Sequence, residues 1–176
     1  MKTLLEYPIL NAYRSHVPAG FYAERGHTGE DYKVAANTEL PCPLTGTIIA
    51  QIKQVEMGWC VYLRHDATGH VWVFAHCNKF VRRVGDRINR GEVFLVTGTT
   101  GKKVKGAHVH VECITPGPMN LEDKVMLRPE LRVPFNGKGY NTRPSTMLRH
   151  LYLQSSVDPI TLKSTTPDVA HNPHGF

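Results

Sequence analysis

Short, mostly apolar runs fill the first two thirds of the chain, with polar residues between them. These runs cover residues 46–50, 59–65, 71–76, 92–97 and 107–114. They are rich in β-branched and aromatic residues and are separated by turn residues, which is typical of strands. No run with helical spacing competes with them there. The pattern therefore predicts a mainly β fold, a small antiparallel β-sheet or barrel-sandwich domain.

One hairpin can be predicted in register. Residues 66–69, Asp-Ala-Thr-Gly, fit a four-residue loop between two of the runs. Such a loop places these residues opposite one another: His65 and His70, Leu63 and Trp72, and Trp59 and His76. The other face of the same strands then carries Cys60, Tyr62, Val73 and Ala75.

The sequence changes character after residue 114. Five prolines, at positions 116, 118, 129, 134 and 144, and the pair Asn136-Gly137 predict an irregular insertion. A short helix fits residues 146–153. Residues 163–176 have little apolar content and read as a tail.

Composition and charge narrow the class of protein. The chain has 176 residues, of which 41% are hydrophobic, which suits one compact domain. Its net charge of +6 favours an anionic partner such as nucleic acid, a membrane surface or a bacterial wall polymer. No apolar run is long enough to span a membrane. Glu6 and Pro8 interrupt the apolar start, so we expect no export signal.

Basic and aromatic residues have ordinary interpretations. Arg82, Arg83, Arg87 and Arg90 fit a solvated basic edge better than a nucleic-acid interface. The same holds for the aromatic residues Trp59, Trp72 and Phe74, which suit a core or a groove wall better than a platform for base stacking. We therefore expect no nucleic-acid partner.

The four cysteines, Cys42, Cys60, Cys77 and Cys113, lack C-x-x-C spacing. Neither a zinc ribbon nor a thioredoxin-like motif is indicated. We expect buried free thiols without a disulfide framework.

Histidines carry the candidate chemistry. His108 and His110 lie two apart in a predicted strand and so share a face. His27 and Asp31 lie four apart with a glycine between them, which lets a loop bring both to one point. Two imidazoles and a carboxylate with one open position suit a catalytic zinc site. Each pattern alone is weak, and His76 alone would be read as a satisfied buried histidine.

The order of these motifs resembles a known family. The segments are His27-x-Gly29-x-Asp31, the tripeptide at 74–76, and residues 84–92, 98–101 and 106–112. Together they resemble the lysostaphin-type (LytM-like) zinc metallopeptidases, which cut peptidoglycan. The resemblance implies zinc held by His27, Asp31 and His110, with His76 and His108 as catalytic residues that are not ligands.

Departures from the family pattern are modest. Phe74, Cys77, Ala107 and Val111 replace its usual Tyr, Leu, Pro and aromatic residue, and none of the four is a ligand or a proton-transfer group. Which of the two catalytic histidines is the general base stays open. Glu112 could orient a ligand histidine or be a solvated strand residue, and Tyr22 is similarly open.

The resemblance also sets domain boundaries. It implies an N-terminal arm at 1–23, a zinc peptidase domain at 24–162 and a C-terminal tail at 163–176. Within the domain lie a core at 24–114, an insertion at 115–156 and a closing segment at 157–162, where Val157-Asp158-Pro159 is similar to that of the family.

The predicted function is that of a zinc-dependent endopeptidase acting on the cross-bridges or stems of bacterial peptidoglycan. One zinc ion per chain is expected. An intact set of five functional positions favours an enzyme over a non-catalytic wall-binding or structural module on the same fold. A wall-cutting enzyme without an export signal suggests a bacteriophage origin, as a free lysin or as a virion component whose extra segments dock to phage tail proteins.

Overall fold

The computed structural model describes residues 1–13, 27–102, 104–115 and 140–154. The predictions for Tyr22, for residues 116–139, for the closing segment and for the tail lie outside these ranges. The elements in chain order are a 3-10 helix η1 (Leu4–Glu6) and the strands β1 (Ile9–Asn11), β2 (Glu30–Tyr32), β3 (Glu39–Pro41), β4 (Gly46–Gln54), β5 (Gly58–His65), β6 (Val71–Phe80), β7 (Arg87–Ile88), β8 (Val93–Thr97), β9 (Val109–Thr115) and β10 (Tyr140–Thr142), followed by the helix α2 (Pro144–Gln154).

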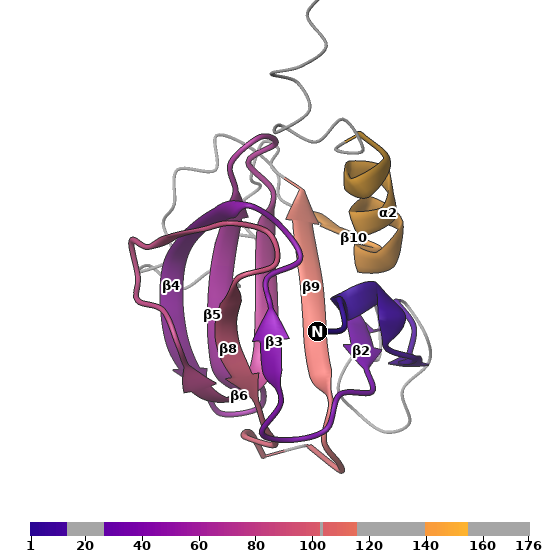
Figure 1. Cartoon of the computed structure of the whole chain (residues 1–176). Coiled ribbons are helices and arrows are strands. Elements are labelled where there is room, and N and C mark those ends of the chain that lie inside the picture. Colours follow the sequence, from indigo (N-terminus) through magenta and orange to yellow (C-terminus); the bar gives the residue numbers. More distant parts are fainter. Residues whose placement is uncertain (14–26, 103, 116–139, 155–176) are drawn as a thin grey trace, which may run out of the picture.

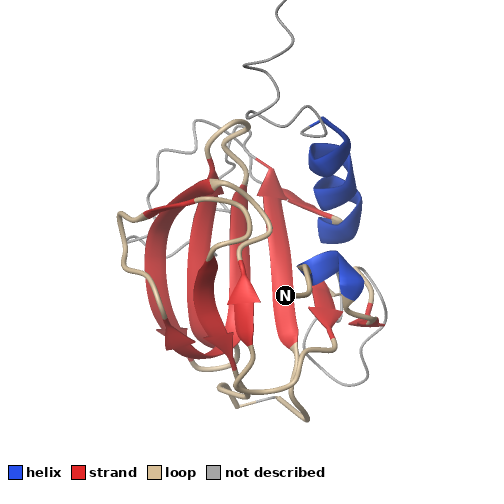
Figure 2. Ribbon diagram, in the orientation of Figure 1, coloured by secondary structure: helices blue, strands red, loops and turns tan. Residues whose placement is uncertain are grey.

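The strands form one antiparallel sheet in the order β1-β2-β9-β6-β5-β4-β7 (Figure 1). Three short strands lie off this path: β10 pairs with β9, and β3 pairs with β8, which also pairs with β6. In the described part of the chain, strands make up most of the regular structure (Figure 2), and the helix α2 lies beside β9 and β10 (Figure 1). The predicted mainly β, antiparallel fold is therefore confirmed, and the sheet is open.

Alternation along β6 divides the apolar residues between two clusters. Trp72 and Phe74 are fully buried in the larger cluster, together with residues of β3, β8 and α2. Val71, Val73 and Ala75 belong to a smaller cluster, which also holds Cys60, Tyr62 and Ile114. Because successive strand residues point to opposite faces, the two clusters lie on opposite sides of the sheet. The predicted grouping of Cys60, Tyr62, Val73 and Ala75 on one face is confirmed.

The predicted hairpin register holds near the loop and fails farther away. His65 donates its backbone N–H to the carbonyl of His70 at 2.8 Å, and Leu63 pairs with Trp72, as expected. Trp59, however, pairs with Cys77 and not with His76. A β-bulge between these points adds one residue to β6 and shifts the register. His76 lies in this bulge with a φ of 63°.

Both ends of the described chain pack on the sheet. Leu4 is fully buried, and β1 pairs with β2. The predicted helix at 146–153 is present within α2, whose Leu148 and Leu151 join the larger core. Pro144 begins this helix, a position where the missing proline N–H costs no helical hydrogen bond. The described part of the N-terminal arm therefore packs against the domain.

Two simpler expectations concern the cysteines and the membrane. All four cysteines are buried and none forms a disulfide, as predicted. Among the residues that the structure describes, no helix has the length and apolar character needed to cross a membrane.

Candidate metal centre

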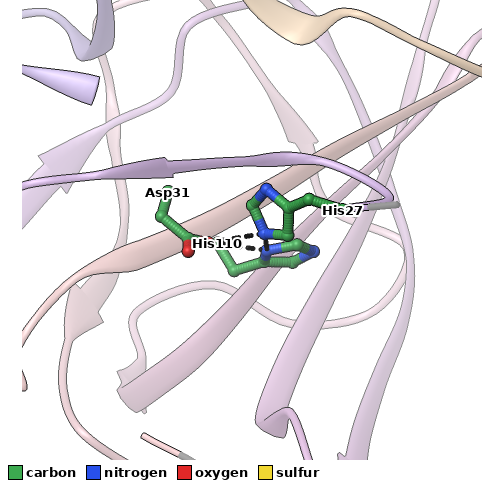
Figure 3. Close-up of side chains that lie close together, drawn as sticks. All are labelled: His27, Asp31 and His110. Carbon is green, nitrogen blue, oxygen red and sulfur yellow. Dashed lines mark hydrogen bonds and ion pairs between the residues drawn. The ribbon is translucent and has the colours of Figure 1, made fainter. Parts of the chain in front are cut away.

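Two adjacent strands bring the three predicted ligands together. Asp31 lies on β2 directly opposite His110 on β9, and His27 lies just before β2. Paired residues of antiparallel strands place their side chains on the same face. The three side chains meet there, as Figure 3 shows, and all are at least 94% buried.

A glycine explains the spacing of the first motif. A side chain at Gly29 would collide with the carbonyl of Val111, and its Cβ would lie 3.0 Å from Cε1 of His110. Only a glycine lets the segment between His27 and Asp31 lie this close to β9. The close approach sets both residues against His110.

The three facing atoms form a triangle of the size that zinc requires. Nε2 of His27 lies 3.1 Å from Nδ1 of His110 and 3.2 Å from Oδ1 of Asp31. The remaining side, from Nδ1 of His110 to Oδ1 of Asp31, is 2.8 Å. Tetrahedral zinc with bonds of about 2.0–2.1 Å keeps its ligand atoms about 3.3 Å apart. The donor set and its spacing therefore fit this ion.

The outward-facing nitrogens fix the tautomers of both histidines. Nδ1 of His27 lies 3.1 Å from the carbonyl oxygen of Ala12 and can only donate to it. Nε2 of His110 lies 3.2 Å from Oε1 of Glu112. In the tautomers that a bound cation requires, these outward N–H groups are the ones kept, and two nitrogen lone pairs and a carboxylate would then face one another in a buried space. A cation among them satisfies all three.

The carboxylates of Asp31 and Glu112 each accept a hydrogen bond from a further side chain. Asn11 donates from Nδ2 to the second oxygen of Asp31, Oδ2, at 2.7 Å. Thr28 donates from its hydroxyl to Oε1 of Glu112. Glu112 therefore acts as the partner that orients His110, which decides between the two interpretations left open by the sequence. Asn11 was missed, because nothing local shows that β1 pairs with β2 and sets Asn11 opposite Asp31.

The contacts among these side chains shift the pKa values of Asp31 and His110. Burial alone would raise the pKa of Asp31, but hydrogen bonds from His110 and His27 outweigh it and hold the pKa well below its usual range. Burial would lower the pKa of His110, yet the carboxylates of Asp31 and Glu112 raise it to about 9. The site without metal is thus strongly polarised toward a positive charge at its centre.

The two remaining histidines lie beside this triangle. The rings of His76 and His108 are 4.6 Å apart, and the rings of His76 and His110 are 6.2 Å apart. Each uses Nδ1 to donate to a backbone carbonyl: His76 to Thr100 at 2.9 Å and His108 to Gly106 at 2.8 Å. Nε2 of His108 lies 3.8 Å from Oδ1 of Asp31. The structure therefore brings together all five residues that the sequence singled out.

The position of His76 is unusual in two respects. Burial lowers its pKa to about 4, so its imidazole is neutral at neutral pH. Its backbone is in the left-handed region, within the bulge of β6. Strained residues in bulges are enriched at functional sites, which agrees with its place beside the candidate ligands.

The predicted aromatic and basic residues lie away from the metal triangle. Trp72 and Phe74 are core residues, whereas Trp59 is 37% exposed and lines an open groove with Phe80, so both predicted interpretations occur. Among the arginines, two lie at the surface beside acidic groups, Arg82 near Glu92 and Arg87 near Asp66. Arg90 is also exposed, and its guanidinium lies 3.6 Å from the centre of the Tyr152 ring of α2.

Comparison of this chain with known proteins identifies a matching protein family. Residues 25–121 match the model of peptidase family M23. No curated protein matches the chain. The solved catalytic domain of the antimicrobial peptidase lysostaphin from Staphylococcus simulans is 22% identical with a TM-score of 0.58, over 63% of this chain and 82% of that one.

Two further solved structures are similar. A zinc-containing peptidase from Vibrio cholerae is 21% identical with a TM-score of 0.53, over 61% of this chain and 33% of that one. The catalytic domain of a mutant of the prophage-encoded M23 protein EnpA from Enterococcus faecalis is 19% identical with a TM-score of 0.55, over 77% and 88%. These likenesses establish a shared fold. The family model covers more than half of the chain, so the protein belongs to peptidase family M23.

Proposed function

We propose that this protein is a zinc-dependent endopeptidase that hydrolyses peptide cross-bridges or stems of bacterial peptidoglycan. The observation that carries the proposal is the buried triangle of His27, Asp31 and His110, with two further histidines beside it. M23 peptidases are zinc metallopeptidases that act on cell walls, which agrees with the donor set found here.

The three residues of the triangle would hold the metal through Nε2 of His27, Oδ1 of Asp31 and Nδ1 of His110. Zinc supplies Lewis acidity, which polarises a peptide carbonyl and lowers the pKa of a water molecule. Glu112 and the carbonyl of Ala12 keep the two imidazoles in the tautomers that this role requires.

Proton transfer falls to His76 and His108. Their Nδ1–H groups are bound to backbone carbonyls, so the Nε2 atoms are the ones available to accept a proton. Amide hydrolysis needs a proton taken from water and one delivered to the leaving amine. Two imidazoles whose rings lie 4.6 Å apart can share these transfers.

We also propose that this enzyme is a lysin of bacteriophage origin. Support comes from the net charge of +6, which suits anionic wall polymers, and from the likeness to a prophage-encoded M23 protein. Of the two phage roles, the free lysin is favoured, because the described parts of the terminal arm and of the insertion pack on their own domain. Protein identification in purified virions tests this choice, since a tail component would be found there.

The function itself is tested on purified sacculi. We expect about one zinc per chain by elemental analysis, and muropeptides released by the zinc-loaded protein, with their masses identifying the bond that is cut. A zinc-loaded, folded protein that binds sacculi and releases no fragments would instead support the non-catalytic wall-binding module.

A further inference from the structure

A buried carboxylate lies on the reverse side of the strand that carries Asp31. Glu30 precedes Asp31 in β2 and is only 1% exposed. Because neighbouring strand residues point to opposite faces, Asp31 faces the metal centre and Glu30 faces away from it. Glu30 shares that reverse face with Tyr32 of the larger core, close to the start of α2.

Four donors surround this carboxylate. Ser145 donates its backbone N–H to Oε2 at 2.7 Å and its hydroxyl to Oε1 at 2.9 Å. The hydroxyl of Tyr32 donates to Oε2 at 2.9 Å. Nε of Arg143, whose side chain is 53% exposed, lies 3.4 Å from Oε1. A buried carboxylate is tolerated only with such partners, so this arrangement depends on all of them being in place.

The start of α2 is well suited to this contact. Ser145 is the second residue of the helix, and its N–H is among those that lack a partner within the helix. The helix dipole also favours a negative charge at this end. The helix lies outside residues 25–121, which match the family model, so the contact joins an additional element to the family domain.

We propose that Glu30 is a positioning residue that fastens the start of α2 to β2 and thereby fixes Asp31 for metal binding. The inference rests on the proposed function, because it assigns Asp31 as a metal ligand. The chain of contacts is short. Glu30 accepts hydrogen bonds from Ser145 of α2 on one face of β2. The next residue, Asp31, contacts both candidate ligand histidines on the other face.

A purely structural role makes a different prediction. If Glu30 only added stability, its replacement would lower the melting temperature and leave the zinc affinity of the folded protein unchanged. If it positions Asp31, the folded protein would bind zinc more weakly and the β2–β9 pairing would open more often. Zinc affinity and local hydrogen exchange therefore separate the two roles.

The decisive variant is Glu30→Gln in the full chain, which keeps the size of the side chain and removes its charge. We expect zinc binding, measured by competition with a chelator, to weaken about tenfold, the low end of the effect of losing a supporting partner. Leu95→Ala is the matched control, because Leu95 is fully buried on β8 and takes no part in this contact. It should lower the melting temperature and leave zinc affinity within about twofold of the original.

A second variant approaches the contact from the helix. Ser145→Ala removes one donor to Glu30 and keeps the backbone N–H. We expect zinc binding to weaken about threefold and the double variant with Glu30→Gln to be less than additive, since both changes act on one contact. Should Glu30→Gln fail to fold, Ser145→Ala decides alone: an unchanged zinc affinity would overturn the proposal.

Hydrogen exchange of the metal-free protein tests the positioning role of Glu30 without zinc. The amides of β2 should exchange faster in Glu30→Gln, while those of β5 keep their rates. Unchanged exchange in β2 would overturn the positioning role. If the unaltered protein bound no zinc, the proposed function would fail, and the exchange comparison would still decide whether Glu30 fixes β2.

Discussion

Replacing Asn11 with alanine tests whether the N-terminal arm supports the metal centre. Asn11 donates from Nδ2 to Oδ2 of Asp31 at 2.7 Å, while Oδ1 of the same carboxylate faces the two ligand histidines. The amide thus holds the oxygen that is turned away from the triangle. Its loss should let the Asp31 carboxylate rotate, so that Oδ1 is no longer fixed for metal binding.

The size of the effect follows from the exposure of Asn11. A hydrogen bond to a charged group contributes about 1.5–3 kcal/mol. Asn11 is exposed, so water can replace its amide, and the lower end of that range applies. A loss of about 1.5 kcal/mol weakens the zinc affinity slightly more than tenfold, because about 1.4 kcal/mol corresponds to a factor of ten. Supporting partners of metal ligands typically cost about 10–100-fold when removed, which includes this value.

The assay is competition between the folded protein and a zinc chelator at neutral pH. Leu10→Ala is the matched control, because Leu10 lies on the same strand and is 50% exposed. We expect Asn11→Ala to bind zinc about tenfold more weakly and Leu10→Ala to bind it normally. Equal zinc affinity in Asn11→Ala and the unaltered protein would refute the supporting role of the arm.

Three further predictions concern the histidines and the cysteines. His110→Ala should lose both zinc and hydrolysis, while His108→Ala should keep zinc and lose hydrolysis; equal metal loss in the two would contradict the assignment of roles. His76 has a pKa of about 4 in the folded protein, whereas an unperturbed histidine has a pKa of about 6.5. The unfolded chain therefore binds more protons between these two pH values, and stability falls as the pH falls. Urea unfolding of the metal-free protein should therefore show about 2 kcal/mol more loss between pH 7 and pH 5 than His76→Asn, which tolerates the left-handed backbone; equal losses would show that His76 is not buried in neutral form. Thiol titration of the denatured protein, prepared without oxidant, should find all four cysteines free, and two or fewer would indicate disulfides.

The sequence predicts the central strands and the site residues because both depend on local patterns. Alternation along β6 separates the two faces of the sheet, and the spacing of His108 and His110 places both in one strand segment. The spacing of His27 and Asp31 around a glycine is similarly local. These signals can be read from a few neighbouring residues, but each is weak alone. The five candidate residues could be named in advance because the order of the motifs resembles a known family.

The supporting contacts could not be predicted, because each joins residues far apart in the chain. Asn11 meets Asp31 only because β1 pairs with β2, and Glu30 meets Ser145 only because α2 packs on the reverse face. Glu30 does give a partial signal, since a charged residue beside a ligand in a buried strand needs a partner. Nothing in the local sequence indicates the bulge at His76. The sequence therefore predicts that His76 pairs with Trp59, whereas Trp59 pairs with Cys77.

The most direct test of the account compares the zinc-loaded protein with zinc-loaded His108→Ala on the same purified sacculi. The measurement is the number of new amino groups released over time, because hydrolysis of a peptide bond creates one for each bond cut. We expect steady release by the unaltered protein and a rate lower by about a hundredfold or more in the variant. Equal release by both proteins, or none by the unaltered protein with zinc bound, would contradict the account.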